Sequence, residues 1–215
     1  MKKIVILGSG NEQINAIKIA NNLGYYVISL DSNPTAPGAK FSDSFFQCDI
    51  SSAKSVYEIV KNLKIDGIMV HAIELSNVVA EVSEKLGLPG ITREVAINAT
   101  NKLKRLEILK NNHIPCAEFG SATDINEAKN VAQDIGYPVV IKPVDNAGSR
   151  GVIQIKNSEK MERYFDESIQ FCKNKKEIIV EEYLTGPQVS TETVVYKNKC
   201  YTTGFSDRNY CNLKK

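Results

Sequence analysis

The feature that most constrains the fold is a regular alternation of apolar strands and amphipathic helices over the first ninety or so residues. The expected strands are residues 4–7, 26–30, 45–48 and 68–70, and the expected helices are residues 14–23, 55–63 and 78–86. This spacing predicts a doubly wound parallel sheet with helices on both of its faces. We therefore expect an α/β fold in this part of the chain.

The pattern changes after Thr92, where a smaller helix-and-hairpin unit is expected. A long helical stretch from Val95 to Asn111 comes first, and Asp124 then caps a second helix. The remaining elements are a strand ending at Lys142, a helix at 158–171, a strand at 177–182, and antiparallel strands at 189–196 and 200–204. We accordingly divide the chain into domains at residues 1–93 and 94–215.

The segment from Val139 to Val152 contains the residues that are most informative about function. An apolar strand delivers Lys142, and a loop of small and polar residues, Asp145–Gly151, leads into a second apolar strand. Its glycines allow positive φ, so several backbone N–H groups can face one anion, while Lys142 and Arg150 add positive charge. Such a unit can close over a nucleotide, although it lacks the Walker pattern. The alternative is a surface hairpin turn with two solvated charges.

A second glycine-rich turn follows the first expected strand. Gly8, Ser9, Gly10 and Asn11 open a helix, whose N-terminus favours an anion. Asp31 stands where a ribose-binding acid would stand in a dinucleotide-binding fold, but Gln13 replaces the third glycine of that pattern. An NAD(P)-dependent oxidoreductase is therefore one alternative function. The other interpretation is that tight turns after parallel strands simply use glycine.

Composition narrows the classes of function. The formal charge of +2 and the absence of a basic block give no reason to expect nucleic acid. The five cysteines include no C-x-x-C spacing and there are two histidines, so we expect neither a zinc nor an iron–sulfur site. The N-terminal apolar run is too short for a signal peptide, and no segment approaches the ~20 residues of a membrane span. We expect a cytoplasmic protein without membrane contact.

Taken together and in order, four features resemble the ATP-grasp superfamily: Lys102, Ile141-Lys142-Pro143, the Asp145–Gly151 loop and Val180–Leu184. The resemblance covers nearly the whole chain and is nearest to the carbamoyl-phosphate-synthase large-subunit-like and carboxylate–amine ligase branch. It implies a Rossmann-like pre-ATP-grasp domain at residues 1–93. Residues 94–215 would be the first, lid-bearing α+β part of an ATP-grasp domain, apparently truncated.

The resemblance also implies roles for individual residues. Lys142 and Arg150 would act on the phosphates, Glu181 and Leu184 would pair with adenine through their backbone, and Gln188 would replace the usual ribose-binding glutamate. Gly8, Ser9, Gly10 and Asn11 would face the carboxylate substrate or its anion. The full set of nucleotide-binding residues is Lys102, Lys142, Asp145, Asn146, Ala147, Gly148, Ser149, Gly151, Glu181, Glu182, Tyr183, Leu184 and Gln188.

The implied reaction is ATP-dependent ligation: a carboxylate is phosphorylated to an acyl phosphate and joined to an amine or ammonia. Family members hold Mg²⁺ with a glutamate and a Glu-x-Asn segment, whereas Glu192 and Asp207 are the only acids after Tyr183 here. The resemblance thus places the magnesium ligands C-terminal to residue 215, and none in this chain. We expect the 215-residue chain alone to be inactive, with a homodimer or second chain able to complete the site. A non-catalytic nucleotide-binding module is a further alternative.

Overall fold

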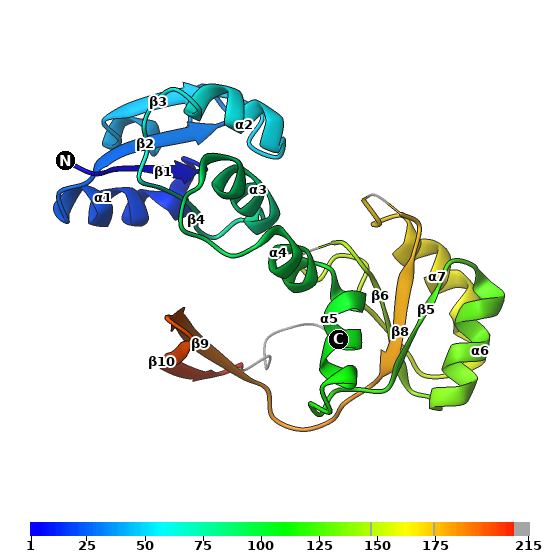
Figure 1. Ribbon diagram of the computed structural model, residues 1–215. Coiled ribbons are helices and arrows are strands. Elements are labelled where there is room, and N and C mark those ends of the chain that lie inside the picture. The colour runs from blue at the N-terminus through cyan, green and yellow to red at the C-terminus, as the bar shows by residue number, and fades with distance from the viewer. Residues whose placement is uncertain (147, 174, 209–215) are drawn as a thin grey trace.

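The computed structural model describes residues 1–146, 148–173 and 175–208. Figure 1 shows two α/β lobes joined through helices α4 and α5, with a two-stranded hairpin, β9–β10, set apart from the second lobe. Among the residues described, no helix is both long enough and apolar enough to cross a bilayer.

The first lobe contains the expected parallel sheet, in the strand order β3-β2-β1-β4. Its strands are β1 (Lys3–Leu7), β2 (Tyr26–Asp31), β3 (Ser44–Gln47) and β4 (Gly67–Val70). Strand β1 pairs in parallel with β2 on one side and with β4 on the other. The prediction of a parallel sheet is confirmed.

Helices cover both faces of this sheet because successive strand residues point to opposite sides. Ile6 packs with Ile17 of α1, whereas Leu7 packs with Val56 of α2 and Val82 of α3. All five side chains are fully buried. The helical elements of this lobe are η1 (Asn11–Gln13), α1 (Ile14–Asn22), η2 (Ala39–Phe41), α2 (Ala53–Val60) and α3 (Ser76–Leu86).

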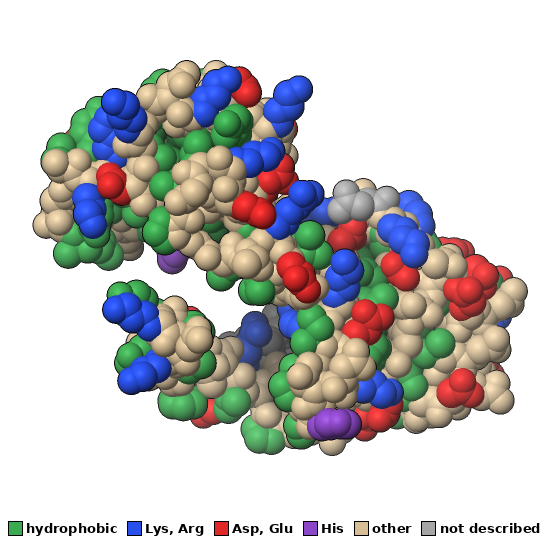
Figure 2. All heavy atoms as spheres, viewed as in Figure 1, with side chains coloured by type: hydrophobic (Ala, Val, Ile, Leu, Met, Phe, Trp, Pro, Cys, Tyr) green, Lys and Arg blue, Asp and Glu red, His purple; other side chains and the backbone are tan. Residues whose placement is uncertain are grey.

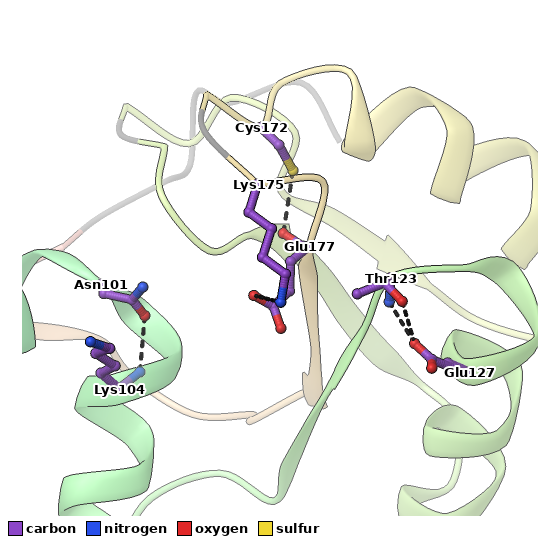
Figure 3. A network of polar contacts seen from close by, with 7 residues as sticks. All are labelled: Asn101, Lys104, Thr123, Glu127, Cys172, Lys175 and Glu177. Atoms are coloured by element: carbon purple, nitrogen blue, oxygen red, sulfur yellow. Dashed lines mark hydrogen bonds and ion pairs between the residues drawn. The ribbon is translucent and has the colours of Figure 1, made fainter.

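The single helix expected from Val95 to Asn111 is wrong, because the structure has two helices there. They are α4 (Arg93–Thr100) and α5 (Lys102–Asn111). Asn101 separates them with an extended ψ of 113°, and its side chain accepts the N–H of Lys104 at 3.0 Å (Figure 3). Asparagine is a favoured N-cap residue, so this bond begins a new helix and turns the chain. The turn brings Lys102 to the junction of the lobes.

The second lobe contains an antiparallel sheet in the order β5-β8-β6-β7. Strand β5 was not expected, because Phe119-Gly120-Ser121-Ala122 shows no clear apolar alternation. It fits because Gly120 lies under helix α6, where a Cβ would come within 2.7 Å of Val131. The elements are β5 (Phe119–Ala122), α6 (Ile125–Ile135), β6 (Val139–Pro143), β7 (Ile153–Ile155), η3 (Ser158–Lys160), α7 (Met161–Ile169) and β8 (Ile178–Glu182).

The core of the second lobe lies between one face of this sheet and helices α6 and α7. Ile141, Ile178 and Phe165 belong to it. Residues one position along β6 and β8 point to the opposite face, and Lys142 and Glu181 are two of these. The pleat of the strands therefore places a charged pair on the face away from the helices.

The hairpin consists of β9 (Val189–Tyr196) and β10 (Lys199–Asp207), paired antiparallel. Lys197 and Asn198 both have positive φ, of 46° and 59°, which is the geometry of a type I′ hairpin turn. The expected hairpin is present, and β10 extends to Asp207 rather than ending at Gly204.

Candidate nucleotide site

The centre of the candidate site is an ion pair between β6 and β8. Lys142 Nζ lies 2.5 Å from Glu181 Oε1, and their side chains are only 17% and 15% exposed. The register pairs Lys142 with Ile179 and Val140 with Glu181, so the two charged residues are diagonal neighbours on one face. The ion pair fixes the direction of the Lys142 side chain. Glu181 occupies one N–H donor of the Lys142 ammonium group, so the other two donors remain for another acceptor.

Lys102 approaches the same region from the first turn of α5. Its backbone N–H donates to the carbonyl of Val144 at 3.2 Å, and its ammonium group donates to the carbonyl of Asn146. Burial lowers the pKa of Lys102; nearby Glu74 raises this pKa, and the positive charge of Lys142 lowers it further. The two lysines, 40 positions apart in the chain, are therefore close enough to repel each other.

The loop at residues 145–151 connects β6 to β7. Gly148, Ser149 and Gly151 all have positive φ, of 68°, 57° and 75°. The two glycines serve different purposes. A Cβ at Gly151 would lie 2.9 Å from Pro143 Cγ, so packing requires that glycine, whereas a Cβ at Gly148 would meet nothing within 4 Å. Gly148 thus borders open space, as a residue that approaches a ligand should.

Among the remaining described residues of the loop, some hold it to the rest of the protein and others lie exposed to solvent. Asp145 Oδ1 accepts the N–H of Lys173 at 2.9 Å, which ties the base of the loop to the segment before β8. Asn146 is buried, and Arg150 is exposed. Ala147 lies outside the described residues. Figure 3 shows the same pre-β8 segment held by Lys175 and Glu177, which are 3.3 Å apart, and by the Cys172 thiol on the Glu177 carbonyl.

The end of β8 contains the residues expected at the adenine. The Glu182 N–H donates to the carbonyl of Glu118 at 2.8 Å, and the Tyr183 N–H donates to that of Pro138 at 3.3 Å. Leu184 is 63% exposed. Gln188 lies farther along, at the base of the hairpin, where its carbonyl accepts the N–H of Arg208 at 2.8 Å. The structure thus brings Lys102, Lys142 and Glu181 together, and sets Gln188 beside the hairpin.

The glycine-rich turn at Gly8–Asn11 lies in the first lobe, and its donors are partly used within the protein. The Gly8 N–H donates to the Leu30 carbonyl, and the Ser9 N–H donates to Asp31 Oδ2, both at 2.7 Å. Asp31 Oδ1 also accepts the N–H of Asn33 at 2.8 Å. Asp31 therefore closes the turn after β1, which works against the ribose-binding role that an oxidoreductase would give it.

Sequence reasoning gave no site role to Glu74 and Arg105, which lie where the lobes meet. Together with Ile73, Ser76, Ala99, Thr100 and Lys102 they line a pocket of about 320 Å³. Figure 2 shows acidic and basic side chains side by side at this junction. The position of Glu74 offered a signal, because it follows the carboxyl end of β4, and ligands of parallel sheets bind beyond those ends.

Magnesium would need oxygen ligands gathered at one point. Within residues 1–146, 148–173 and 175–208, no group of three or more His, Cys, Asp or Glu side chains is arranged to hold a metal ion. The described residues therefore do not fit a complete magnesium site.

Comparison with known proteins identifies both lobes. Residues 100–212 match the family described as phosphoribosylglycinamide synthetase, ATP-grasp (A) domain, and residues 1–93 match the ribonucleotide synthetase preATP-grasp domain. The chain is 29% identical over 186 residues to a formate-dependent phosphoribosylglycinamide formyltransferase of Prochlorococcus marinus (strain NATL2A), covering 85% of this chain and 48% of that protein.

Two further relatives agree. A carbamoyl phosphate synthase large chain of Thermotoga neapolitana is 29% identical over 184 residues, which cover 78% of this chain and 17% of that one. The crystal structure of phosphoribosylglycinamide synthetase from Anaerococcus prevotii superimposes with a TM-score of 0.72 at 27% identity, covering 96% of this chain and 51% of that one. The chain thus spans about half the length, or less, of these relatives.

The first family match covers more than half of the 215 residues, and the mixed fold agrees with it. The chain therefore belongs to the phosphoribosylglycinamide synthetase ATP-grasp (A) domain family, with a preATP-grasp domain in front of its ATP-grasp part.

Proposed function

We propose that this chain is the nucleotide-binding front portion of an ATP-dependent carboxylate–amine ligase. The proposal keeps the domain division at residues 1–93 and 94–215. It also keeps Mg²⁺ as a cofactor, with ligands from outside the described residues, a cytoplasmic location, and small carboxylate and amine substrates. The relatives named as formyltransferase, carbamoyl phosphate synthase and phosphoribosylglycinamide synthetase support this class of reaction.

One observation carries the proposal: two ammonium groups from different elements converge beside an open glycine-containing loop. Lys102 loses part of its affinity for a proton through burial, and Lys142 adds repulsion. Glu181 already pairs with Lys142, so an anionic ligand would add a second counter-charge, shared by Lys102 and the unused donors of Lys142. Triphosphate oxygens fit this set of donors, because hydrogen bonds to charged groups contribute about 1.5–3 kcal/mol each.

The bound nucleotide would supply the phosphoryl group that turns a carboxylate into an acyl phosphate. The protein's own part is to position and to neutralise charge. Glu181 holds the Lys142 ammonium in one direction, and the Asn146 carbonyl does the same for Lys102. Asp145 anchors the loop that carries Gly148, Ser149 and Arg150.

The test is a calorimetric titration of the chain with ATP, together with the variant Lys142→Met. Loss of one charge-assisted contact should weaken binding roughly 10- to 100-fold. Because Lys142→Met leaves Glu181 without its partner, the double variant Lys142→Met/Glu181→Gln tests the same loss without an uncompensated carboxylate. Lys156→Met is the matched control, since Lys156 is an exposed lysine that follows β7.

Equal ATP affinity in wild type and in both Lys142 variants would contradict the proposed site. NADP⁺ binding in place of ATP would favour the oxidoreductase alternative. We expect ATP binding without carboxylate-dependent ADP release from this chain, and robust release would contradict the expectation that the chain alone is inactive. A full-length polypeptide that binds ATP yet phosphorylates no carboxylate would favour the non-catalytic module.

A further inference from the structure

The buried side chain of Gln13 connects two segments that are 58 positions apart in the chain. Gln13 lies at the start of α1 and is only 3% exposed, and its Nε2 donates to the carbonyl oxygen of His71 at 2.7 Å. It stands where the dinucleotide-binding pattern has its third glycine, and a glycine could not make this contact. The residue that departs from the pattern therefore ties the first glycine-rich turn to the loop after β4.

The loop after β4, residues 71–75, is also held against Gly8. A Cβ at Gly8 would lie 2.6 Å from Ile73 Cδ1 and 3.2 Å from Gln13 Cδ. Gly8 has a φ of 91°, so its backbone conformation and its packing both require glycine. The absence of a side chain at Gly8 thus leaves room for the Ile73 and Gln13 side chains to meet over the turn.

The backbone of the same loop is sharply bent. Ala72 has a positive φ of 57°, which is unfavourable for a residue with a Cβ and persists where surrounding contacts impose it. The Leu75 N–H donates to the Ile73 carbonyl at 3.0 Å, so Glu74 is the central residue of a three-residue turn. The anchors at His71 and Ile73 therefore come immediately before the residue whose side chain reaches the junction of the lobes.

Glu74 in turn acts on Lys102 of the candidate nucleotide site, and both residues line the junction pocket. Burial lowers the pKa of Lys102, and the largest opposing influence is the charge of Glu74, which raises it. The charges of Lys142, Arg105 and Asp145 also act on Lys102. Glu74 thus helps to keep Lys102 protonated, which is the form that attracts phosphate oxygens.

We propose that Gln13 is a positioning residue for the candidate nucleotide site: it holds residues 71–75 so that Glu74 stays beside Lys102. The inference rests on the nucleotide-binding function proposed above. The contacts run from Gln13 to His71, through the turn to Glu74, and from Glu74 to Lys102. A buried amide in the first lobe therefore governs the charge of a phosphate-binding group on α5.

The first test is the variant Gln13→Met, which keeps the length of the side chain and removes its donor. We expect the loop to shift, so that Glu74 acts less on Lys102 and the Lys102 pKa falls further below its ordinary value. NMR of the chain with ¹³C-labelled lysine follows this group from about pH 7 to about pH 11, a range that includes the ordinary lysine pKa of about 10.4.

Asn15→Met is the matched control, because Asn15 is an exposed amide residue of the same helix. It should leave the titration of Lys102 unchanged. An unchanged Lys102 pKa in Gln13→Met, or equal falls in the two variants, would overturn the inference.

A double-mutant cycle separates positioning from a general loss of stability. In Glu74→Gln the carboxylate charge is absent, so adding Gln13→Met should lower the Lys102 pKa no further. A further fall as large as that in the wild-type background would mean that Gln13 acts on Lys102 by another route, against the proposal.

Ile73→Ala loosens the same loop at its contact with Gly8 and tests the coupling without any change at Gln13. It should lower the Lys102 pKa in the same direction as Gln13→Met. This variant decides the question if Gln13→Met does not fold, and a Lys102 pKa equal to that of wild type would then overturn the proposal.

ATP affinity over the same pH range is the functional readout. A neutral Lys102 loses a charge-assisted contact, which is worth roughly 10- to 100-fold in affinity. Affinity should therefore decline as the pH rises, and the decline should begin at lower pH in Gln13→Met than in wild type. An equal loss at every pH would indicate a structural role alone and would contradict the inference.

This inference and the proposed function can fail separately. ATP binding that depends on Lys142, with no change in the titration of Lys102 in Gln13→Met, would overturn the inference and leave the proposed function standing. A lower Lys102 pKa in Gln13→Met, in a chain that binds no ATP, would contradict the proposed function and leave the link from Gln13 to Lys102 standing.

Discussion

The two antiparallel units of the molecule differ in what supports them. In the sheet β5-β8-β6-β7, one face packs on α6 and α7, and Ile141, Ile178 and Val180 are fully buried. In the hairpin β9–β10 the large side chains remain in solvent, with Val189 63% and Phe205 78% exposed. A lone two-stranded hairpin is marginally stable in water. Both units thus have hydrogen-bonded strand pairing, and they differ in the apolar area that they bury.

The largest expected contrast is in amide hydrogen exchange. The N–H groups of Ile179 and Val180 lie in a strand paired on both sides, so they should exchange only through opening that costs about 5 kcal/mol or more. Those of Val194 and Val195 should open at almost no cost. Exchange followed by NMR measures both. Protection of the hairpin equal to that of β8 would show that something covers the hairpin in solution.

Ile141→Ala should give the largest mutational effect. Ile141 is fully buried against α6 and α7, and truncation of such a side chain costs about 2–5 kcal/mol through lost transfer energy and the cavity that remains. Urea unfolding monitored by circular dichroism measures the change. A loss below about 1 kcal/mol would mean that this core can collapse around the missing atoms.

Asp124→Ala should have an intermediate effect on the packed unit. Its side chain accepts the N–H groups of Asn126 and Glu127, at 2.7 and 3.0 Å, and so caps α6. Loss of such a cap costs about 1 kcal/mol. Asp134→Ala near the other end of α6 is the control: removing a negative charge from a helix C-terminus should not destabilise the protein. Equal losses for both variants, measured by urea unfolding, would contradict the capping argument.

Phe205→Ser should have the smallest effect. A side chain that is 78% exposed loses little contact, so we expect a change within about 0.5 kcal/mol. The denaturant midpoint of the chain is the measurement. A loss similar to that of Ile141→Ala would show that the hairpin is packed against another surface, and would remove the contrast between the two units.

Local pattern was sufficient for much of the fold. The alternation of apolar runs and helical spacing predicted the parallel sheet, and the turn Lys197–Asn198 lies where the hairpin was expected. Local pattern failed to predict the correct elements where a residue suits more than one kind of element. Asn101 looks like an ordinary helical residue between two amphipathic stretches, yet its side chain caps α5 and divides the expected helix. Strand β5 was missed because its residues are small. The close approach of helix α6 requires this small size, and local sequence does not show that contact.

The candidate site was also predictable only in part, because some of its features depend on local sequence and others on contacts between distant segments. The proposed roles of Lys142, the 145–151 loop and residues 181–184 follow from the sequence resemblance, and the period of two residues in β6 sets Lys142 opposite to Ile141. The pairing of Lys142 with Glu181 depends on the register between β6 and β8. That register joins two strands that are far apart along the chain, so no local segment contains it.

The sequence by itself determined which residues alternate, which face of each strand is apolar, and which family the chain resembles, because these follow from side-chain periodicity and order along the chain. Only the tertiary structure decided that Lys102 reaches the Asn146 carbonyl, and that Glu74 and Arg105 line one pocket between the lobes. Such contacts join segments far apart in sequence. Their geometry depends on how whole elements pack together, and that information is spread over every residue of both lobes.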